Sequence, residues 1–445
     1  MPRRPQHTLL RVLLNNRLVG RLSRAPSGAI AFQYAQEWLD REHALPVSLS
    51  LPLREDAYHG APVVAVFDNL LPDSDDLRRR VADRVGAAGT DAYSMLAAIG
   101  HDCVGALQFV VDDDEHRGIA PENAGQIHGQ PVNTQEIEGL LHGLAQAPLG
   151  LSRDDPFRIS MAGAQEKTAL TRHEGQWLKP YETTATTHIF KTQIGTLPNG
   201  IDLTNSIENE YYCLKLASAF GLPVNDAAIQ TFGSTKALVI TRFDRRWTQD
   251  GRLLRLPQED CCQALSVPPT QKYQSEGGPA LIDILKLLRG CDEPERDQSS
   301  VLKAQIFFWL IGATDGHAKN FSLFLTPGGR YSLTPLYDIL TAEPNVKAGQ
   351  IQHKQMRLAM SVGDNNHYRF GEITGRHFIQ TGLAAGLPRK LIYSVIDEIA
   401  STSNNTLKNI EAELPRDFPA EIHDTVNTAV MKRARGLESA MADEK

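Results

Sequence analysis

The sequence predicts an α+β protein with two lobes, the first rich in strands and the second rich in helices. Segments that alternate apolar and polar residues, the pattern of half-buried strands, dominate the first 240 residues. From Pro257 onward, apolar residues recur at helical spacing, and residues 420–441 read as a long amphipathic helix. At 445 residues the chain is long for one hydrophobic core, so two or three units are expected.

Composition excludes several classes of protein. The formal charge of −7, from 46 basic and 53 acidic residues, disfavours a protein that holds nucleic acid by a large basic surface of its own. It leaves room for a DNA-binding partner. Five cysteines without C-x-x-C spacing predict reduced thiols, and neither a signal peptide nor a membrane-spanning run is recognised. We therefore expect a cytoplasmic protein.

Residues 1–111 are predicted to form a β-rich subdomain. Residues 8–32 alternate around an Asn-Asn-Arg turn, which is typical of a β-meander. Residues 47–51 also alternate, and Pro52 would end that strand. Two helices and a closing strand are then expected at 75–85, 91–99 and 105–111.

The rest of the chain divides into three predicted parts. Residues 112–150 carry several prolines and glycines around one helical stretch and are interpreted as a linker or insertion. Residues 151–240 are predicted to form the nucleotide-binding part of the first lobe, and residues 241–445 a helical lobe. In the former we expect a hairpin of strands 157–160 and 168–172, a strand at 188–191, a helix at 207–220 and a strand at 237–240. In the latter we expect helices at 279–289, 298–311, 374–385, 389–401, 405–413 and 420–441.

Residues 312–321 (GATDGHAKNF) are the most informative stretch. They follow an apolar helical segment, and Gly312 stands where a helix commonly stops. Asp315 and Asn320 have the spacing of the kinase catalytic loop, in which an Asp accepts the proton of the attacking hydroxyl and an Asn holds Mg²⁺. Asp338 follows as a possible second metal ligand. Each aspartate taken alone could also be an ordinary turn residue.

Other parts of a phosphoryl-transfer site occur in the right order. The loop from Ser160 to Lys167 could lay backbone N–H groups on phosphates, although no Walker A motif is present. Lys191, at the end of a strand, suits a lysine that reaches the α- and β-phosphates, or is an ordinary edge lysine. Glu210 is the candidate ion-pair partner of Lys191, in competition with Glu208. Residues 241–243 would form the hinge that faces the adenine edge.

Several segments together resemble the HipA-type serine/threonine kinases, which are the toxin components of bacterial toxin–antitoxin pairs. They are FRISMAGAQEKTAL, THIFK, ENEYYCLKLA, RFDRRW, RLPQEDCCQ, WLIGATDGHAKNFSLF and LTPLYDIL, with SLSLPL and FDNLLPDS near the start. The resemblance implies a bilobal protein-kinase-like fold, with an elaborated β-rich N-terminal lobe and an all-helical C-terminal lobe. It departs from familiar kinases in having Gly316-His317 after the catalytic Asp and YDI in place of DFG.

The resemblance also implies roles for particular residues. Asp315 would be the catalytic base, Asn320 and Asp338 the Mg²⁺ ligands, and Lys191 the phosphate-binding lysine. Ser160 would be the autophosphorylated serine, whose phosphate would repel those of ATP and eject the loop. The other implied ATP-binding residues are Ala162, Gly163, Ala164, Gln165, Glu166, Lys167, Thr241, Arg242, Phe243, His317, Ala318, Lys319 and Tyr337.

Partners follow from the resemblance in the same way. The implied protein substrate is an aminoacyl-tRNA synthetase, glutamyl-tRNA synthetase in the best-known case, and its phosphorylation would cause growth arrest and persistence. The implied partner is a HipB-like helix-turn-helix antitoxin dimer, which binds operator DNA with the toxin as co-repressor and would place it on the nucleoid. Two alternatives stay open: an antitoxin-binding co-repressor with vestigial kinase activity, and a small-molecule or lipid phosphotransferase.

Overall fold

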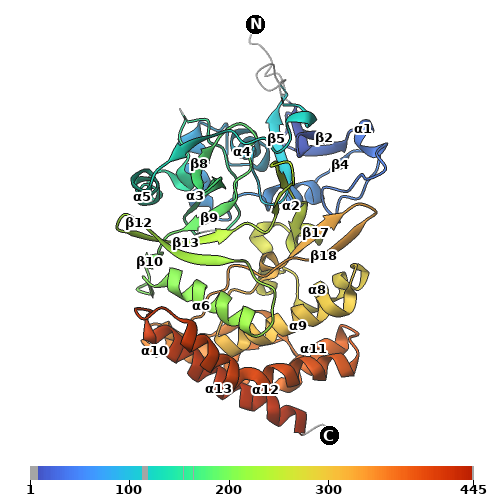
Figure 1. Ribbon diagram of the computed structural model, residues 1–445. Coiled ribbons are helices and arrows are strands. Elements are labelled where there is room, and N and C mark those ends of the chain that lie inside the picture. The colour runs from blue at the N-terminus through green and yellow to red at the C-terminus, as the bar shows by residue number, and fades with distance from the viewer. Residues whose placement is uncertain (1–8, 113–118, 154, 164, 443–445) are drawn as a thin grey trace. The chain divides into compact units, whose positions relative to one another are not determined.

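The computed structural model describes residues 9–112, 119–153, 155–163 and 165–442, and the chain forms two compact units (Figure 1). Unit 1 comprises Met1–Thr192, Gln230–Thr270 and Leu323–Tyr331. Unit 2 comprises Gln193–Ile229, Gln271–Ser322 and Ser332–Lys445. Both helices and sheets are present, which confirms the predicted fold class.

The first sheet of unit 1 has five strands in the order β4-β3-β2-β1-β5. Its first turn is a tight hairpin because Asn15 and Asn16 adopt left-handed backbone angles, with φ of 47° and 62°. Phe32, Phe67 and Phe109 stack edge-to-face on its buried side. The strands are β1 (Leu10–Leu14), β2 (Arg17–Arg24), β3 (Ile30–Tyr34), β4 (Tyr58–His59) and β5 (Leu107–Val111), and the helices are α1 (Gln36–Leu39), α2 (Ala61–Asp68), α3 (Asp75–Val85) and α4 (Ala92–Ile99). The predicted meander and both predicted helices are confirmed.

The strand predicted at residues 47–51 is wrong. The backbone of this segment bonds to side chains instead of a neighbouring strand: Leu49 N–H donates to Glu259 Oε1 over 2.8 Å, and Val47 N–H donates to the Tyr34 hydroxyl over 2.9 Å. Ser50 Oγ donates to the carbonyl of Gln263 over 2.8 Å. Burial does not follow the alternation of apolar and polar residues, since Ser48 is fully buried and Leu49 only partly.

The second sheet has the strand order β12-β13-β9-β7-β8-β6. Asn133 caps α5 (Thr134–His142), whose Ile137 belongs to one buried cluster with Leu170 and Phe190 of the sheet. The strands are β6 (Gly129–Val132), β7 (Lys167–His173), β8 (Gln176–Pro180), β9 (His188–Lys191), β12 (Ala227–Phe232) and β13 (Thr235–Thr241). Shorter elements of unit 1 are β14 (Arg245–Trp247), β15 (Leu253–Arg255), β16 (Gln258–Asp260) and α7 (Cys261–Ala264). The strand expected at 157–160 is absent from the described chain, because Ser160 N–H donates to the carbonyl of Asp102 over 2.9 Å, and no hairpin forms there.

Unit 2 is mostly helical. Its helices are α6 (Ser206–Ala219), α8 (Leu281–Leu287), α9 (Pro294–Ile311), α10 (Glu343–Lys347), α11 (Gly375–Ala384), α12 (Arg389–Glu413) and α13 (Ala420–Ala442). The lobe predicted at residues 241–445 is not purely helical, since it also holds the hairpin β19–β20 (Arg357–Val362 and His367–Arg369). Unit 2 further includes the hairpin β10–β11 (Gly195–Thr196 and Asp202–Leu203). In unit 1, a further small sheet joins β16 to β17 (Ser322–Thr326) and β18 (Arg330–Leu333), whose residues 323–331 belong to that unit.

The two helices predicted at 389–401 and 405–413 form the single helix α12. Residues 402–404 lay between the two predicted ranges. The hydroxyls of Ser401, Thr402 and Ser403 donate to carbonyls one turn earlier, over 2.7, 2.6 and 2.6 Å. Back-bonding of this kind satisfies the side chains without ending the helix.

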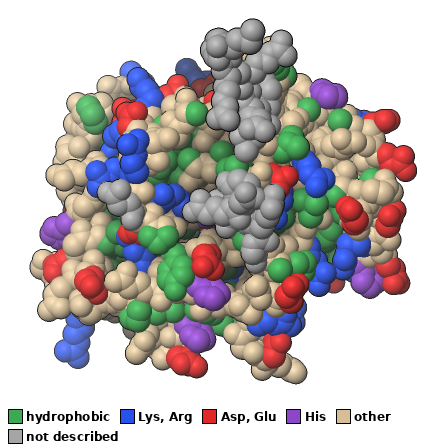
Figure 2. All heavy atoms as spheres, turned by 90° about the horizontal axis from the view of Figure 1, so that it is seen from above, with side chains coloured by type: hydrophobic (Ala, Val, Ile, Leu, Met, Phe, Trp, Pro, Cys, Tyr) green, Lys and Arg blue, Asp and Glu red, His purple; other side chains and the backbone are tan. Residues whose placement is uncertain are grey.

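Charges of both signs are interspersed on the face shown in Figure 2, outside the part that the grey atoms cover. This agrees with the modest net charge of the chain. Among the described residues, no helix is both long enough and apolar enough to span a bilayer.

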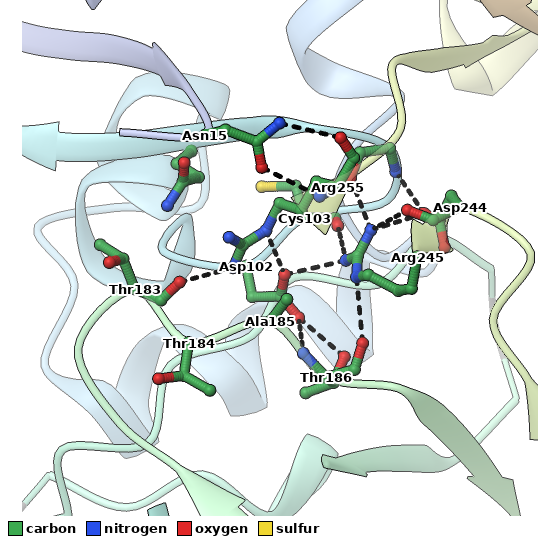
Figure 3. A network of polar contacts seen from close by, with 12 residues as sticks. Asn15, Asp102, Cys103, Thr183, Thr184, Ala185, Thr186, Asp244, Arg245 and Arg255 are labelled. Atoms are coloured by element: carbon green, nitrogen blue, oxygen red, sulfur yellow. Dashed lines mark hydrogen bonds and ion pairs between the residues drawn. The ribbon is translucent and has the colours of Figure 1, made fainter. Parts of the chain in front are cut away.

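A buried ionic cluster organises unit 1 (Figure 3). The carboxylate of Asp102 pairs with Arg245 and Arg255, each over 2.8 Å, and Asp244 pairs with Arg242 over 2.7 Å and with Arg245 over 3.0 Å. All five side chains are at most 4% exposed. Burial by itself would raise the pKa of Asp102, but the three guanidinium groups hold that pKa well below its usual range. The cluster is therefore fully charged.

The cluster ties together segments that are far apart in the sequence. Asp102 follows α4, and its carboxylate also accepts hydrogen bonds from the amide and hydroxyl of Thr186, over 3.0 and 2.7 Å, just before β9. Arg255 lies in β15, and its amide and carbonyl both bond to the side chain of Asn15 in the first hairpin, each over 2.9 Å. The N-terminal sheet is thus fixed to the segment that precedes Lys191.

Replacing Asp102 by Asn keeps the shape of the side chain but removes the charge that balances Arg245 and Arg255. Because Arg255 and Arg245 then lose their ion pairs with this carboxylate, and Arg245 keeps only that with Asp244, we expect urea denaturation to show a loss of about 3–5 kcal/mol in the free energy of unfolding. Asp250→Asn, whose ion pair with Arg252 is exposed, is the matched control and should cost far less. A D102N protein as stable as the wild type would contradict this role.

Candidate active site

The candidate catalytic loop begins where α9 ends. Gly312 takes a left-handed conformation with φ of 74°, as predicted for the residue that stops this helix. Ala313 N–H donates to the carbonyl of Phe308 over 2.9 Å, which turns the chain back over the helix. A β-carbon on Gly316 would lie 2.4 Å from the ring of Phe308, so only glycine allows this close packing. The loop is thereby held on a rigid, buried helix.

A tight turn orders the residues that follow Asp315. His317 N–H donates to the carbonyl of Asp315 over 2.8 Å and also to Asn320 Oδ1 over 3.2 Å. Asn320 N–H donates back to the carbonyl of His317 over 2.9 Å, which closes the 3₁₀ turn Ala318–Asn320. The side chain of Asn320 is buried, whereas that of Asp315 is 59% exposed. The turn presents Asp315 to solvent and fixes Asn320 beneath it.

Asp338 lies beside this turn. Asn320 Nδ2 donates to the carbonyl of Asp338 over 3.4 Å. The hydroxyl of the preceding residue, Tyr337, donates to the carbonyl of Lys319 over 2.7 Å and lies 2.5 Å from Ser322 Oγ. Asp338 itself has φ of 58°, a left-handed conformation that is costly for a residue with a β-carbon and often marks a functional position.

Unit 2 therefore brings together six of the predicted site residues: Asp315, His317, Lys319, Asn320, Tyr337 and Asp338. The amide oxygen of Asn320 and the carboxylate of Asp338 are hard oxygen donors of the kind that Mg²⁺ prefers, and their binding of one cation stays a prediction. Ala318 lies in the same turn and is buried. No cluster of three or more His, Cys, Asp or Glu side chains occurs in the part of the chain that the structure describes, so a cation here needs other oxygen ligands.

Unit 1 carries the predicted phosphate-binding residues. Lys167 in β7 lies directly opposite Lys191 in β9, and both side chains are buried. Lys167 Nζ donates to the carbonyl of Ala162 over 2.6 Å, and a β-carbon on Gly163 would lie 2.7 Å from that nitrogen. Glycine thus allows the loop to close over the lysine.

The other predicted residues of this loop are Ala164, Gln165 and Glu166. Gln165 Nε2 donates to the carbonyl of Thr192 over 3.0 Å, next to Lys191. Glu166 forms an ion pair with Arg80 over 3.3 Å, with both side chains about one-third exposed. Ala164, also predicted to bind ATP, lies outside the described residues.

Ser160 is completely buried in this conformation. Its hydroxyl donates to the carbonyl of Leu70 over 2.8 Å, and its amide donates to that of Asp102 over 2.9 Å. A buried hydroxyl cannot reach a phosphate donor. Any phosphorylation of Ser160 therefore requires this segment to leave its place.

The predicted hinge residues are found at the end of β13. Thr241 pairs with His188, and Arg242 N–H donates to the carbonyl of Thr187 over 2.9 Å. The guanidinium of Arg242 belongs to the buried ionic cluster, so its side chain does not point to a ligand. Phe243 packs edge-to-face on Phe324 at 5.6 Å. Contact of this segment with adenine stays a prediction.

The contacts of α6 bear on which of its two glutamates, Glu208 or Glu210, could pair with Lys191. Glu208 accepts a hydrogen bond from Gln193 Nε2 over 2.7 Å, and Gln193 also accepts from the amide of Ile207 over 3.0 Å. Glu208 thus holds the start of the helix. Glu210 is 1% exposed, and its ion pair with Lys191 stays a prediction.

Sequence analysis missed one residue at this site. The hydroxyl of Tyr273 donates to Asp315 Oδ1, and its ring packs on that of His317. The only feature of the sequence that pointed to Tyr273 was its place in QKYQSEGG, a polar stretch with two glycines just before α8.

We expect Asp338→Gly to separate stability from cation binding. Glycine adopts the left-handed conformation at little cost, so the free energy of unfolding should be unchanged or up to about 1 kcal/mol higher. The carboxylate is lost, so the thermal shift that Mg²⁺ with ATP gives the wild type should disappear. Differential scanning fluorimetry measures both effects. A variant several degrees less stable than the wild type, or one that keeps the Mg²⁺–ATP shift, would contradict this assignment.

Comparisons with known proteins identify the family of the chain. Residues 159–407 match the HipA-like C-terminal domain, and residues 10–110 match the HipA N-terminal domain. The chain is 33% identical to a putative kinase, Y4mE, of Sinorhizobium fredii over 90% of this chain and 92% of that protein. It is 27% identical to the serine/threonine-protein kinase toxin HipA of Shewanella oneidensis over 91% of this chain and 90% of that protein. A solved complex of Shewanella oneidensis HipA with HipB and operator DNA contains a similar chain, with a TM-score of 0.78 and 25% identity over 96% of each chain.

Proposed function

The chain belongs to the HipA family, and from that membership we propose that it is a serine/threonine protein kinase that transfers the γ-phosphate of ATP to a serine of a translation protein. One observation carries this proposal: Asp315, Asn320 and Asp338, the predicted base and metal ligands, are gathered by a single turn and its neighbour in unit 2. Their charges and oxygen donors are those that phosphoryl transfer requires.

In the proposed mechanism, the exposed carboxylate of Asp315 orients the substrate serine and accepts its proton as the hydroxyl attacks. Asn320 and Asp338 would hold Mg²⁺ through their oxygen atoms. Bound there, Mg²⁺ would neutralise charge on the phosphate oxygens. From unit 1, the ammonium of Lys191 and backbone amides of the loop from Ala162 to Lys167 would supply positive charge and hydrogen-bond donors for phosphate oxygens.

Autophosphorylation of Ser160 is proposed to inactivate the kinase. A phosphate carries about −1.5 to −2 charges at neutral pH. It cannot return to a site where the hydroxyl is fully buried against the carbonyl of Leu70. The modified segment would therefore stay displaced, and the loop that begins at Ala162 with it.

The proposed partners come from the family. The related Shewanella protein was solved with HipB and operator DNA, and we propose that this chain binds a helix-turn-helix antitoxin dimer and joins operator DNA as a co-repressor. The mixed surface charge and net charge of −7 support DNA contact made mainly by the antitoxin. The proposed substrate is an aminoacyl-tRNA synthetase, glutamyl-tRNA synthetase first, with growth arrest and persistence as the result. The proposed location is the cytoplasm, and the nucleoid when bound to antitoxin and DNA.

Self-labelling tests the kinase directly. Purified protein given Mg²⁺ and radiolabelled ATP should incorporate phosphate at Ser160, and Asp315→Ala should lower the rate at least about a hundredfold because the base is lost. Asp397→Ala, at an exposed position on α12 of the same unit, is the matched control and should label like the wild type. Unchanged labelling of D315A would defeat the assignment of the base.

The substrate class is tested by mass spectrometry of phosphopeptides after brief expression of the wild type and of D315A. A synthetase serine phosphorylated only by the wild type is the expected result. An unchanged phosphoproteome would favour a small-molecule or lipid phosphotransferase. Tight antitoxin binding without Mg²⁺–ATP binding would favour a co-repressor with vestigial kinase activity.

A further inference from the structure

We propose that Tyr273 is a positioning residue for Asp315: its phenol hydroxyl holds one carboxylate oxygen and leaves the other to accept the proton of the substrate serine. This inference rests on the proposed kinase activity and adds a residue to it. Tyr273 and Asp315 both belong to unit 2. They are 42 positions apart in the sequence.

Two contacts place Tyr273 at the candidate base. Its hydroxyl donates to Asp315 Oδ1, and its ring meets that of His317 edge-to-face, with centroids 5.0 Å apart and planes at 82°. His317 Nε2 lies 3.9 Å from the same Oδ1, beyond hydrogen-bonding distance. Asp315 is 59% exposed, and a carboxylate so exposed samples several rotamers unless a partner holds it. The phenol is such a partner.

The segment that carries Tyr273 is itself anchored. The amide of Gln274 pairs with both polar groups of Ser361 in β19: Nε2 donates to Ser361 Oγ over 2.9 Å, and Oε1 accepts from Ser361 N–H over 2.7 Å. Gly278 N–H donates to the carbonyl of Tyr273 over 3.0 Å. A β-carbon on Gly278 would lie 2.0 Å from the carbonyl oxygen of Gln271, so this turn requires glycine. Tyr273 is therefore presented by an ordered turn.

The chemistry of the contact suits a positioning role. A carboxylate has two oxygens and about four acceptor sites, so a bond to Oδ1 leaves Oδ2 able to receive a proton. Hydrogen bonds from a hydroxyl to a charged oxygen are short and strong, and they fix the plane of the carboxylate. A base held in its productive orientation lowers the barrier, because less freedom is lost on reaching the transition state.

A second interpretation predicts the opposite result. If the phenol occupied the place of the substrate hydroxyl, Tyr273 would be an internal inhibitor, and removing its hydroxyl would speed the reaction. The phenylalanine variant separates the two, because it keeps the ring that packs on His317 and loses only the hydroxyl.

The experiment compares phosphate transfer to a protein substrate or to Ser160 by the wild type, Tyr273→Phe, and Tyr393→Phe as a control on α12. We expect Y273F to lower kcat roughly 10- to 100-fold, with KM for ATP and the melting temperature unchanged. Y393F should match the wild type. Gln274→Ala should also lower kcat. The double variant Y273F/Q274A should be no slower than Y273F, because both substitutions remove the same support of Asp315.

The experiment distinguishes failure of the positioning role from failure of the proposed kinase activity. An active wild type with Y273F equally fast or faster overturns the positioning role and leaves the kinase assignment intact. A drop in kcat that comes with a lower melting temperature and weaker Mg²⁺–ATP binding would mean that the hydroxyl is only structural, and also overturns it. A wild type that binds Mg²⁺–ATP without transferring phosphate overturns both proposals.

Discussion

The candidate chemistry of unit 2 depends on one local interaction, the hydrogen bond of 3.2 Å from His317 N–H to Asn320 Oδ1. With the return bond from Asn320 N–H, it closes a turn too short for its residues to move independently. The same turn holds Asp315 and Asn320, the proposed base and a proposed metal ligand, and Asn320 Nδ2 donates to the carbonyl of Asp338. The left-handed backbone of Asp338 is sustained because Tyr337 is bonded to the turn.

The arrangement of unit 1 depends on a different feature, the buried ionic cluster centred on Asp102. Three arginines face two aspartates, and carbonyls accept the remaining donors, such as that of Cys103 from Arg242 and Arg245. The free energy needed to remove the ions from water offsets much of the free energy gained from their attraction. A cluster of this kind therefore contributes more to the specificity of the arrangement than to stability. It joins the first hairpin, the Ser160 segment and the strand that ends in Lys191.

The sequence predicted well those features that a single residue type enforces locally. The end of α9 was foreseen because Gly312 tolerates the left-handed cap. Predictions failed where distant partners decide: residues 47–51 bond to Glu259, and Ser160 bonds to Asp102. The role of Tyr273 was missed for the same reason, since its contact spans 42 positions. Spacing predicted a base at Asp315 and metal ligands at Asn320 and Asp338, but no local pattern shows which groups contact them.

The most direct test of the central claim is a crystal structure with Mg²⁺ and a non-hydrolysable ATP analogue. The proposal predicts the cation bound by Asn320 Oδ1 and the carboxylate of Asp338 at about 2.0–2.1 Å. It also predicts the Lys191 ammonium on the α- and β-phosphates, and the γ-phosphate facing Asp315. A nucleotide bound elsewhere, or a cation held without Asn320 and Asp338, would contradict it.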